Sequence, residues 1–171
     1  MPDPAPPPPP ARGEPPRIRF IALRVSRAPS GRCRAEVELE SVDGQSLCGA
    51  ADSQAIAEGD LRAAAAATLD ALHQASSPGA RGGTGPRFAL LGVKNVRAFD
   101  QTIVLLQLGA ATGRGYLRLV GCAVGDDDLV AATVRAVLNA SNRVLWLPLA
   151  TGGPDPVAEV LAAPENVPAG G

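Results

Sequence analysis

The stretch that decides the fold of this chain is Arg118–Asn142, RLVGCAVGDDDLVAATVRAVLNASN. Its first part is rich in valine and small apolar residues, which favours a strand, and the glycine and aspartates that follow favour a turn. From Asp126 to about Leu145 apolar residues recur at helical spacing. They are Leu129, Val130, Val134, Val137, Leu138 and Leu145. The stretch therefore predicts a strand, a tight turn and an amphipathic helix.

A weaker copy of this stretch lies earlier in the chain, from Ser46 to Gln74. The two expected helices align at an offset of 69 residues, which pairs Ala63 with Ala132, Ala67 with Ala136, Leu69 with Leu138, Asp70 with Asn139 and Ala71 with Ala140. The glycines of the preceding strands, Gly49 and Gly121, are 72 apart, so the first copy has three extra residues in its strand-to-helix loop. A repeated unit of this size cannot bury its apolar face alone, and we expect the copies to pack together.

Three strands are expected before each helix. In the first unit the residues from Cys33 to Glu40 alternate between apolar and charged, as in an antiparallel sheet with one face in water. In the second unit Gln101–Leu108 is almost entirely apolar, and we expect a central strand covered on both faces. The expected strands are 18–27, 33–40, 45–51, 87–97, 101–108 and 116–124, and the expected helices are 58–74 and 126–145.

These elements predict an α+β fold of two tandem βββα units, 17–74 and 87–147, joined by a linker at 75–86. The units are expected to be related by pseudo-twofold symmetry, with antiparallel sheets and helices packed on one face. The proline-rich arm 1–16 is expected to be disordered, or to be a ligand for a proline-binding domain. The tail 148–171 is also expected to be disordered.

Composition excludes several classes of function. The net charge of −1 gives no nucleic-acid footprint, and no apolar run is long enough for a membrane span. The chain has three cysteines, Cys33, Cys48 and Cys122, without a CxxC pair, which argues against a disulfide framework or a zinc site. We expect these cysteines to be small apolar residues within strands, and the protein to be cytoplasmic, without metal or cofactor.

The candidate ligand-binding residues lie at the expected helix starts and late in the second helix. They are Gly59, Asp60, Gly125, Asp126, Asp127, Asp128 and Asn139. Backbone amides at a helix start can take a carboxylate, so a small amino-acid-like effector could bind there. The alternative is structural: the aspartates cap the helix and complement its dipole, and Asn139 lies on a solvated face.

No catalytic constellation is visible. The single histidine, His73, lies near a helix end, and Cys122 has no partner in any nucleophile motif. We therefore expect no enzymatic activity.

The tandem units resemble the C-terminal leucine-sensing, dimerisation domain of alpha-isopropylmalate synthase. The resemblance is carried by Gly121, the acidic loop 126–128, Ala132, Ala136 and Asn139, and by Gly49, Ala63, Ala67 and Asp70 in the first unit. It implies a stand-alone regulatory domain without the catalytic barrel, which senses a small effector and forms a homo-oligomer. The glycine-rich first loop of that family is replaced here by residues 53–59. The alternative function is a structural or protein-interaction module that dimerises through its sheet or helices, with the proline arm recruiting a partner.

Overall fold

The computed structural model describes residues 17–54, 56, 58–75, 85–112, 115–125 and 127–145. The arm expected at 1–16, the tail expected at 148–171 and most of the expected linker lie outside these described residues.

The described chain contains two three-stranded antiparallel sheets, each followed by a helix. The first unit comprises β1 (Arg19–Arg27), β2 (Arg32–Glu40), β3 (Ser46–Gln54) and α1 (Gly59–Ala75). The second comprises β4 (Arg87–Ala98), β5 (Gln101–Thr112), β6 (Gly115–Val124) and α2 (Leu129–Ser141). The strands are adjacent in chain order, β1-β2-β3 in sheet A and β4-β5-β6 in sheet B. The predicted βββα duplication is therefore confirmed.

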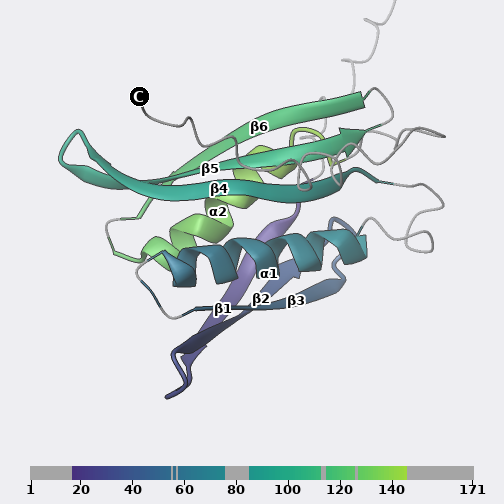
Figure 1. Ribbon diagram of the computed structural model, residues 1–171. Coiled ribbons are helices and arrows are strands. Elements are labelled where there is room, and N and C mark those ends of the chain that lie inside the picture. Colours follow the sequence, from purple (N-terminus) through teal and green to yellow (C-terminus); the bar gives the residue numbers. More distant parts are fainter. Residues whose placement is uncertain are drawn as a thin grey trace, which may run out of the picture.

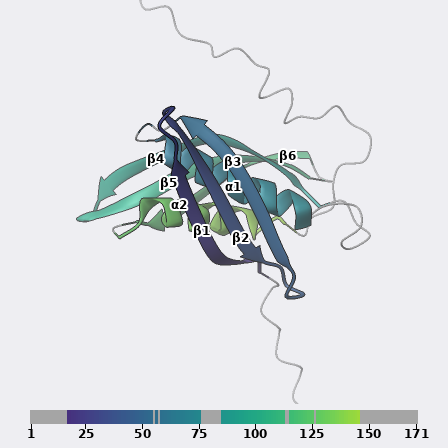
Figure 2. The ribbon, with the colours of Figure 1, turned by 90° about the horizontal axis from the view of Figure 1, so that it is seen from below.

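The molecule has three layers, with both helices between the inner faces of the two sheets (Figures 1 and 2). α1 packs on β2 and β3 of its own unit and also contacts β4. α2 packs on β5 and β6 of its own unit and also contacts β1. Each helix thus touches the first strand of the other unit, as the pseudo-twofold relation requires.

Glycine and alanine set the close approach of each helix to its sheet. A Cβ atom on Gly49 would lie 2.1 Å from the carbonyl oxygen of Ala67, and one on Gly121 would lie 2.1 Å from that of Ala136. Both distances are far inside van der Waals contact, so only glycine fits at either position. The two contacts are copies of each other, which confirms the alignment made from the sequence.

The second helix is shorter than its pattern predicted. It begins at Leu129 rather than Asp126, because the extended backbone of Asp128 lets its carboxylate accept hydrogen bonds from the Val130 and Ala131 amides. It ends at Ser141, where the Asn142 N–H donates to the Leu138 carbonyl and closes the last turn.

Two expectations about burial are wrong in part. β5 is the central strand of sheet B, but Leu105 on its outer face remains 37% exposed because both helices cover only the inner face. Among the cysteines, Cys33 is a buried core residue as expected, whereas Cys48 and Cys122 are exposed. Strand alternation explains the cysteines, since Cys48 and Cys122 occupy outward positions next to the inward Gly49 and Gly121.

Candidate functional site

The start of α2 is already occupied by its own carboxylate. One oxygen of Asp128 accepts from the Val130 amide at 2.9 Å and from the Ala131 amide at 3.0 Å. Gly125 is held by its N–H, which donates to the Thr102 carbonyl at 2.8 Å. Asp127 is exposed, and Asp126 lies outside the described residues. An incoming carboxylate would therefore compete with Asp128 for these amides.

The start of α1 is tied to its own sheet. The Gly59 N–H donates to the Ile56 carbonyl at 2.7 Å, and a Cβ atom on Gly59 would overlap the Gln54 carbonyl. Asp60 forms an ion pair with Arg27 and keeps only 13% of its side chain exposed. Hydrogen bonding to Arg27 holds the pKa of Asp60 below its usual value. Asp60 is therefore neutralised within its own unit.

The buried thiol of Cys33 also lies near this helix start. Its Sγ is 3.7 Å from the Gln54 carbonyl oxygen, and burial followed by the nearby Asp60 carboxylate raises its pKa. A thiol with a raised pKa is protonated at neutral pH and is a poor nucleophile. Cys33 is therefore a packing residue.

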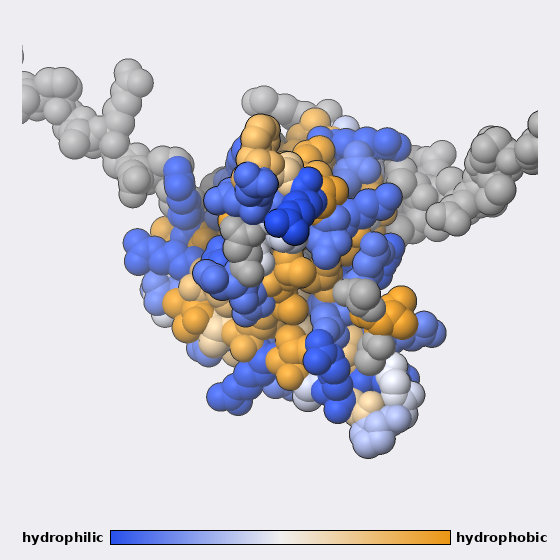
Figure 3. All heavy atoms as spheres, turned by 90° about the vertical axis from the view of Figure 1, so that its left-hand side faces the viewer, coloured by the Kyte–Doolittle hydropathy of each residue, from blue (hydrophilic) through white to orange (hydrophobic). Residues whose placement is uncertain are grey.

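Both helices begin at the same end of the molecule (Figures 1 and 2). Figure 3 views this end and shows apolar surface gathered near its centre, with hydrophilic side chains around it. The structure thus brings Gly59 and Asp60 to the same end as Gly125, Asp127 and Asp128. The two cavities described below lie elsewhere on the molecule.

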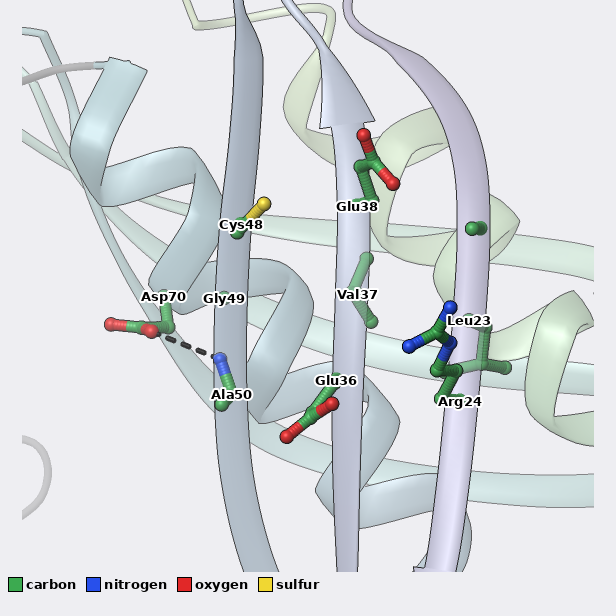
Figure 4. A pocket seen from close by; sticks show the side chains of 10 residues that line it. Leu23, Arg24, Glu36, Val37, Glu38, Cys48, Gly49, Ala50 and Asp70 are labelled. Carbon is green, nitrogen blue, oxygen red and sulfur yellow. Dashed lines mark hydrogen bonds between the residues drawn. The ribbon is translucent and has the colours of Figure 1, made fainter.

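Asn139 lies late in α2 and secures an edge strand. Its Nδ2 donates to the Cys122 carbonyl of β6 at 3.0 Å. The equivalent residue of the first unit, Asp70, accepts from the Ala50 amide of β3 at 3.1 Å (Figure 4). Both bonds reach backbone groups on the open side of an edge strand, β6 or β3. Each helix therefore satisfies a backbone group that no neighbouring strand of the sheet can bond.

A second pair of equivalent side chains joins the two units. The Ile18 N–H donates to Oδ1 of Asn142 at 3.1 Å, and Nδ2 of Asn142 donates back to the Ile18 carbonyl at 3.3 Å. At the other junction the Phe88 N–H donates to Nε2 of His73 at 3.3 Å. His73 and Asn142 are 69 residues apart, so the same helix position anchors the first strand of the opposite unit in both cases. Sequence analysis did not identify either anchor.

A groove of about 760 Å³ lies beside the Ile18–Asn142 contact. We call it the junction groove. It is lined by residues of both units: Arg17, Ile18, Arg19, Phe20, Glu40, Ser41, Val42, Ala123, Val124, Arg135, Leu138, Asn139 and Asn142. Of the sequence-derived candidates that the structure describes, Asn139 is the one that lines it.

The junction groove carries an excess of positive charge. Arg17, Arg19 and Arg135 are exposed, and none has an ion-pair partner among the described residues. The Arg135 guanidinium lies over the Phe20 ring, 5.9 Å from its centroid, which fixes its position beside the groove. Among the described residues that line the groove, Glu40 is the one carboxylate. Unpaired guanidinium groups of this kind favour an anionic ligand.

The opposite junction shares only part of this charge, since Arg87 stands where the groove has Arg17. The strand registers and helix alignment place Ala89 where the groove has Arg19, Gly109 where it has Glu40, and Ala66 where it has Arg135. The duplicated fold therefore forms without Arg19, Glu40 and Arg135. The presence of these three side chains at one junction alone marks the groove as a specialised feature.

A smaller pocket of about 400 Å³ lies on the outer face of sheet A (Figure 4). Small residues such as Ala22 and Ala50 line it together with Arg24, Glu36 and Glu38. The neighbouring ion pairs join Arg34 to Glu36 at 3.2 Å and to Asp52 at 3.3 Å. The acidic strand face predicted from the sequence is this outer face of sheet A.

Within the described part of the chain, no cluster of three or more His, Cys, Asp or Glu residues could hold a metal ion. None of the described helices combines the length and apolar character that crossing a bilayer requires.

Comparison with known proteins gives no assignment: no protein-family model matches the chain, and no curated protein is significantly similar to it.

Proposed function

We propose that this protein is a non-catalytic regulatory module that binds a small amino-acid-like effector. The observation that carries the proposal is the junction groove, where three guanidinium groups from both units, without ion-pair partners among the described residues, surround one cavity. The groove replaces the helix starts as the best candidate location, because the amides at the start of α2 are already bonded to Asp128.

The lining of the groove fits the parts of an amino acid. A carboxylate can bind Arg19 or Arg135 through paired N–H donors, which is the geometry that guanidinium groups favour. The Glu40 carboxylate can accept from an ammonium group. Phe20, Val42 and Leu138 provide an apolar wall for an aliphatic side chain.

A ligand bound in this groove would link the two units of the fold. Arg17, Arg19 and Glu40 belong to the first unit, whereas Arg135 belongs to the second, so a ligand that contacts both groups bridges the units. A ligand that binds only the packed form stabilises it by mass action. The observed βββα duplication agrees with the architecture of the regulatory domain that the sequence resembles, which supports an effector-sensing role.

Calorimetry and thermal shift with a panel of branched-chain amino acids test the proposal. We expect one of them to release heat and to raise the melting temperature. We expect this response to be lost in an Arg19→Ala/Arg135→Ala double variant, because the carboxylate then lacks both guanidinium donors. The variant should still fold, because both positions carry alanine at the opposite junction. Arg62→Ala on the exposed face of α1 is the matched control and should bind as the wild type does. If no amino acid gives heat or a thermal shift with the wild-type chain, the proposal fails.

The alternative function is a protein-interaction module. The helices are buried between the sheets, so dimerisation through them would require the units to separate (Figure 1). The outer faces of the two sheets therefore remain as candidate interaction surfaces. The observation that favours this alternative is the exposure of Leu105, Val120 and Val124 on the outer face of sheet B.

A further inference from the structure

The outer faces of the two sheets differ in character, although the sheets are copies of each other. On sheet B, Leu105 is 37% exposed, Val124 is 48% exposed and Val120 is 61% exposed. With Val96, Ile103 and Cys122 they form what we call the apolar face. The strand registers place these residues in adjacent rows: Val96, Ile103 and Val124 in one, Leu105 and Cys122 in the next, and Val120 in the third.

The duplication provides an internal comparison for this face. In sheet A the row equivalent to Val96, Ile103 and Val124 consists of Ser26, Arg34 and Asp52. Glu36 occupies the position of Leu105. The fold therefore forms with charged side chains at these positions. Apolar residues on sheet B are not needed for the packing of the sheet, which points to a surface that is covered by a partner.

We propose that the apolar face docks against the same face of a second copy of this chain, so that two molecules pack back to back through their B sheets. The proposal concerns a surface apart from the junction groove and does not depend on ligand binding.

The apolar rows and Gln107 favour a copy of the same face as the occupant. None of the residues that the register places on the outer face of sheet B is acidic, and its charged members are Arg87, Lys94 and Arg118. All three lie on the edge strands β4 and β6, where long side chains can extend their charged heads to solvent. Gln107 lies opposite Val120 and is the uncharged polar side chain among the apolar rows. A carboxamide both donates and accepts, so Gln107 can bond its own copy across a twofold axis.

The outer face of sheet B, which contains the apolar face, is large enough for a weak dimer. The whole outer face of sheet B, with strands of 12, 12 and 10 residues, covers about 40 Å by 14 Å at the usual strand rise and spacing. The apolar face is the part of it nearest the β4–β5 turn. Two whole outer faces bury at most roughly 1,100 Å², which is close to the ~1,000 Å² expected of a biological interface. We therefore expect an association that depends on concentration rather than a permanent dimer.

Sedimentation velocity of the full chain over a concentration series tests the proposal. We expect the wild type to shift from the monomer mass to twice that mass as concentration rises. The variant Leu105→Glu/Val124→Asp copies the residues of sheet A and should stay monomeric. Its circular dichroism and melting temperature should remain close to the wild-type values, because sheet A already accepts these residues. Glu38→Gln, on the outer face of sheet A, is the control and should associate normally.

Cross-linking with a short bismaleimide gives a second measurement that needs no disruptive substitution. Cys122 lies on the apolar face, Cys48 lies on the outer face of sheet A, and Cys33 is buried. We expect a cross-linked dimer in the wild type and in Cys48→Ser, and none in Cys122→Ser. A wild type that remains monomeric at every concentration, or a cross-link that depends on Cys48 instead, would overturn the proposal.

Discussion

The close approach of each helix to its sheet gives the sharpest prediction about stability. In Gly121→Ala the new Cβ would lie 2.1 Å from the Ala136 carbonyl oxygen, whereas ordinary contact begins at 3.4 Å. The helix must therefore recede by about 1.3 Å at this point. Because the obstacle is helix backbone, the cost should reach the upper part of the range for overpacked cores, about 3 kcal/mol.

The substitution also has a smaller opposing effect. Alanine restricts the conformations of the unfolded chain more than glycine does, which stabilises the folded state by about 0.5–1 kcal/mol. The expected net loss is about 2 kcal/mol, which corresponds to a fall in melting temperature of roughly 8 °C for a folded body of this size. Gly49→Ala should lose a similar amount, because its Cβ meets the Ala67 carbonyl oxygen at the same distance.

Thermal melts followed by circular dichroism check this prediction, with Gly92→Ala as the matched control. Gly92 also lies within a strand, but a Cβ atom there meets nothing within 4 Å, so its melting temperature should be unchanged or slightly higher. If Gly121→Ala melted within 2 °C of the wild type, or if Gly92→Ala lost as much, the helix contact would not be the reason for glycine at these positions.

Three further predictions concern a cap, a junction anchor and a turn. Asp128→Ala removes the α2 cap and should lower stability by about 1 kcal/mol in urea titrations, whereas Asp127→Ala should have little effect. Burial lowers the pKa of His73 below its usual 6.5, so the folded chain binds that proton more weakly than the unfolded chain. The contribution of His73 to stability should therefore be fully present above pH 6.5 and should fall as the pH drops below that value. In thermal melts the variant His73→Asn, which copies Asn142, should lose this pH dependence. An unchanged pH dependence in the variant would contradict the role given to His73. Phe99 and Asp100 have φ of 53° and 60° in the two-residue β4–β5 turn, where Asn-Gly is preferred, so Phe99→Asn should raise stability by about 1 kcal/mol, and a lower melting temperature would refute this.

The duplicated architecture could be predicted from the sequence because its signal is local. The glycine in the third strand and the alanines of each helix recur at fixed offsets, and the structure places Gly49 against Ala67 as it places Gly121 against Ala136. The start of the second helix was predicted three residues too early, because consecutive aspartates are all good caps and the backbone of Asp128 decides which one serves.

The junction groove could not be predicted in the same way. It depends on the first strand of one unit packing against the helix of the other, and nothing in the local pattern near Arg17 or Arg135 reveals that they share a cavity. Likewise, the apolar run of β5 indicates a central strand, but it does not show whether a second layer covers the outer face. The run therefore predicted cover on both faces, whereas the outer side of Leu105 remains open.

The paired hydrogen bonds between Ile18 and Asn142 have a consequence for chain connectivity. They hold the first strand of the described body against the end of its last helix, so a short peptide could join the two without disturbing either sheet. A circularly permuted chain that begins at the β4 end of the linker and finishes with α1 should then fold to the same three layers. The order in which the two halves are synthesised would be a matter of ancestry rather than of physical necessity.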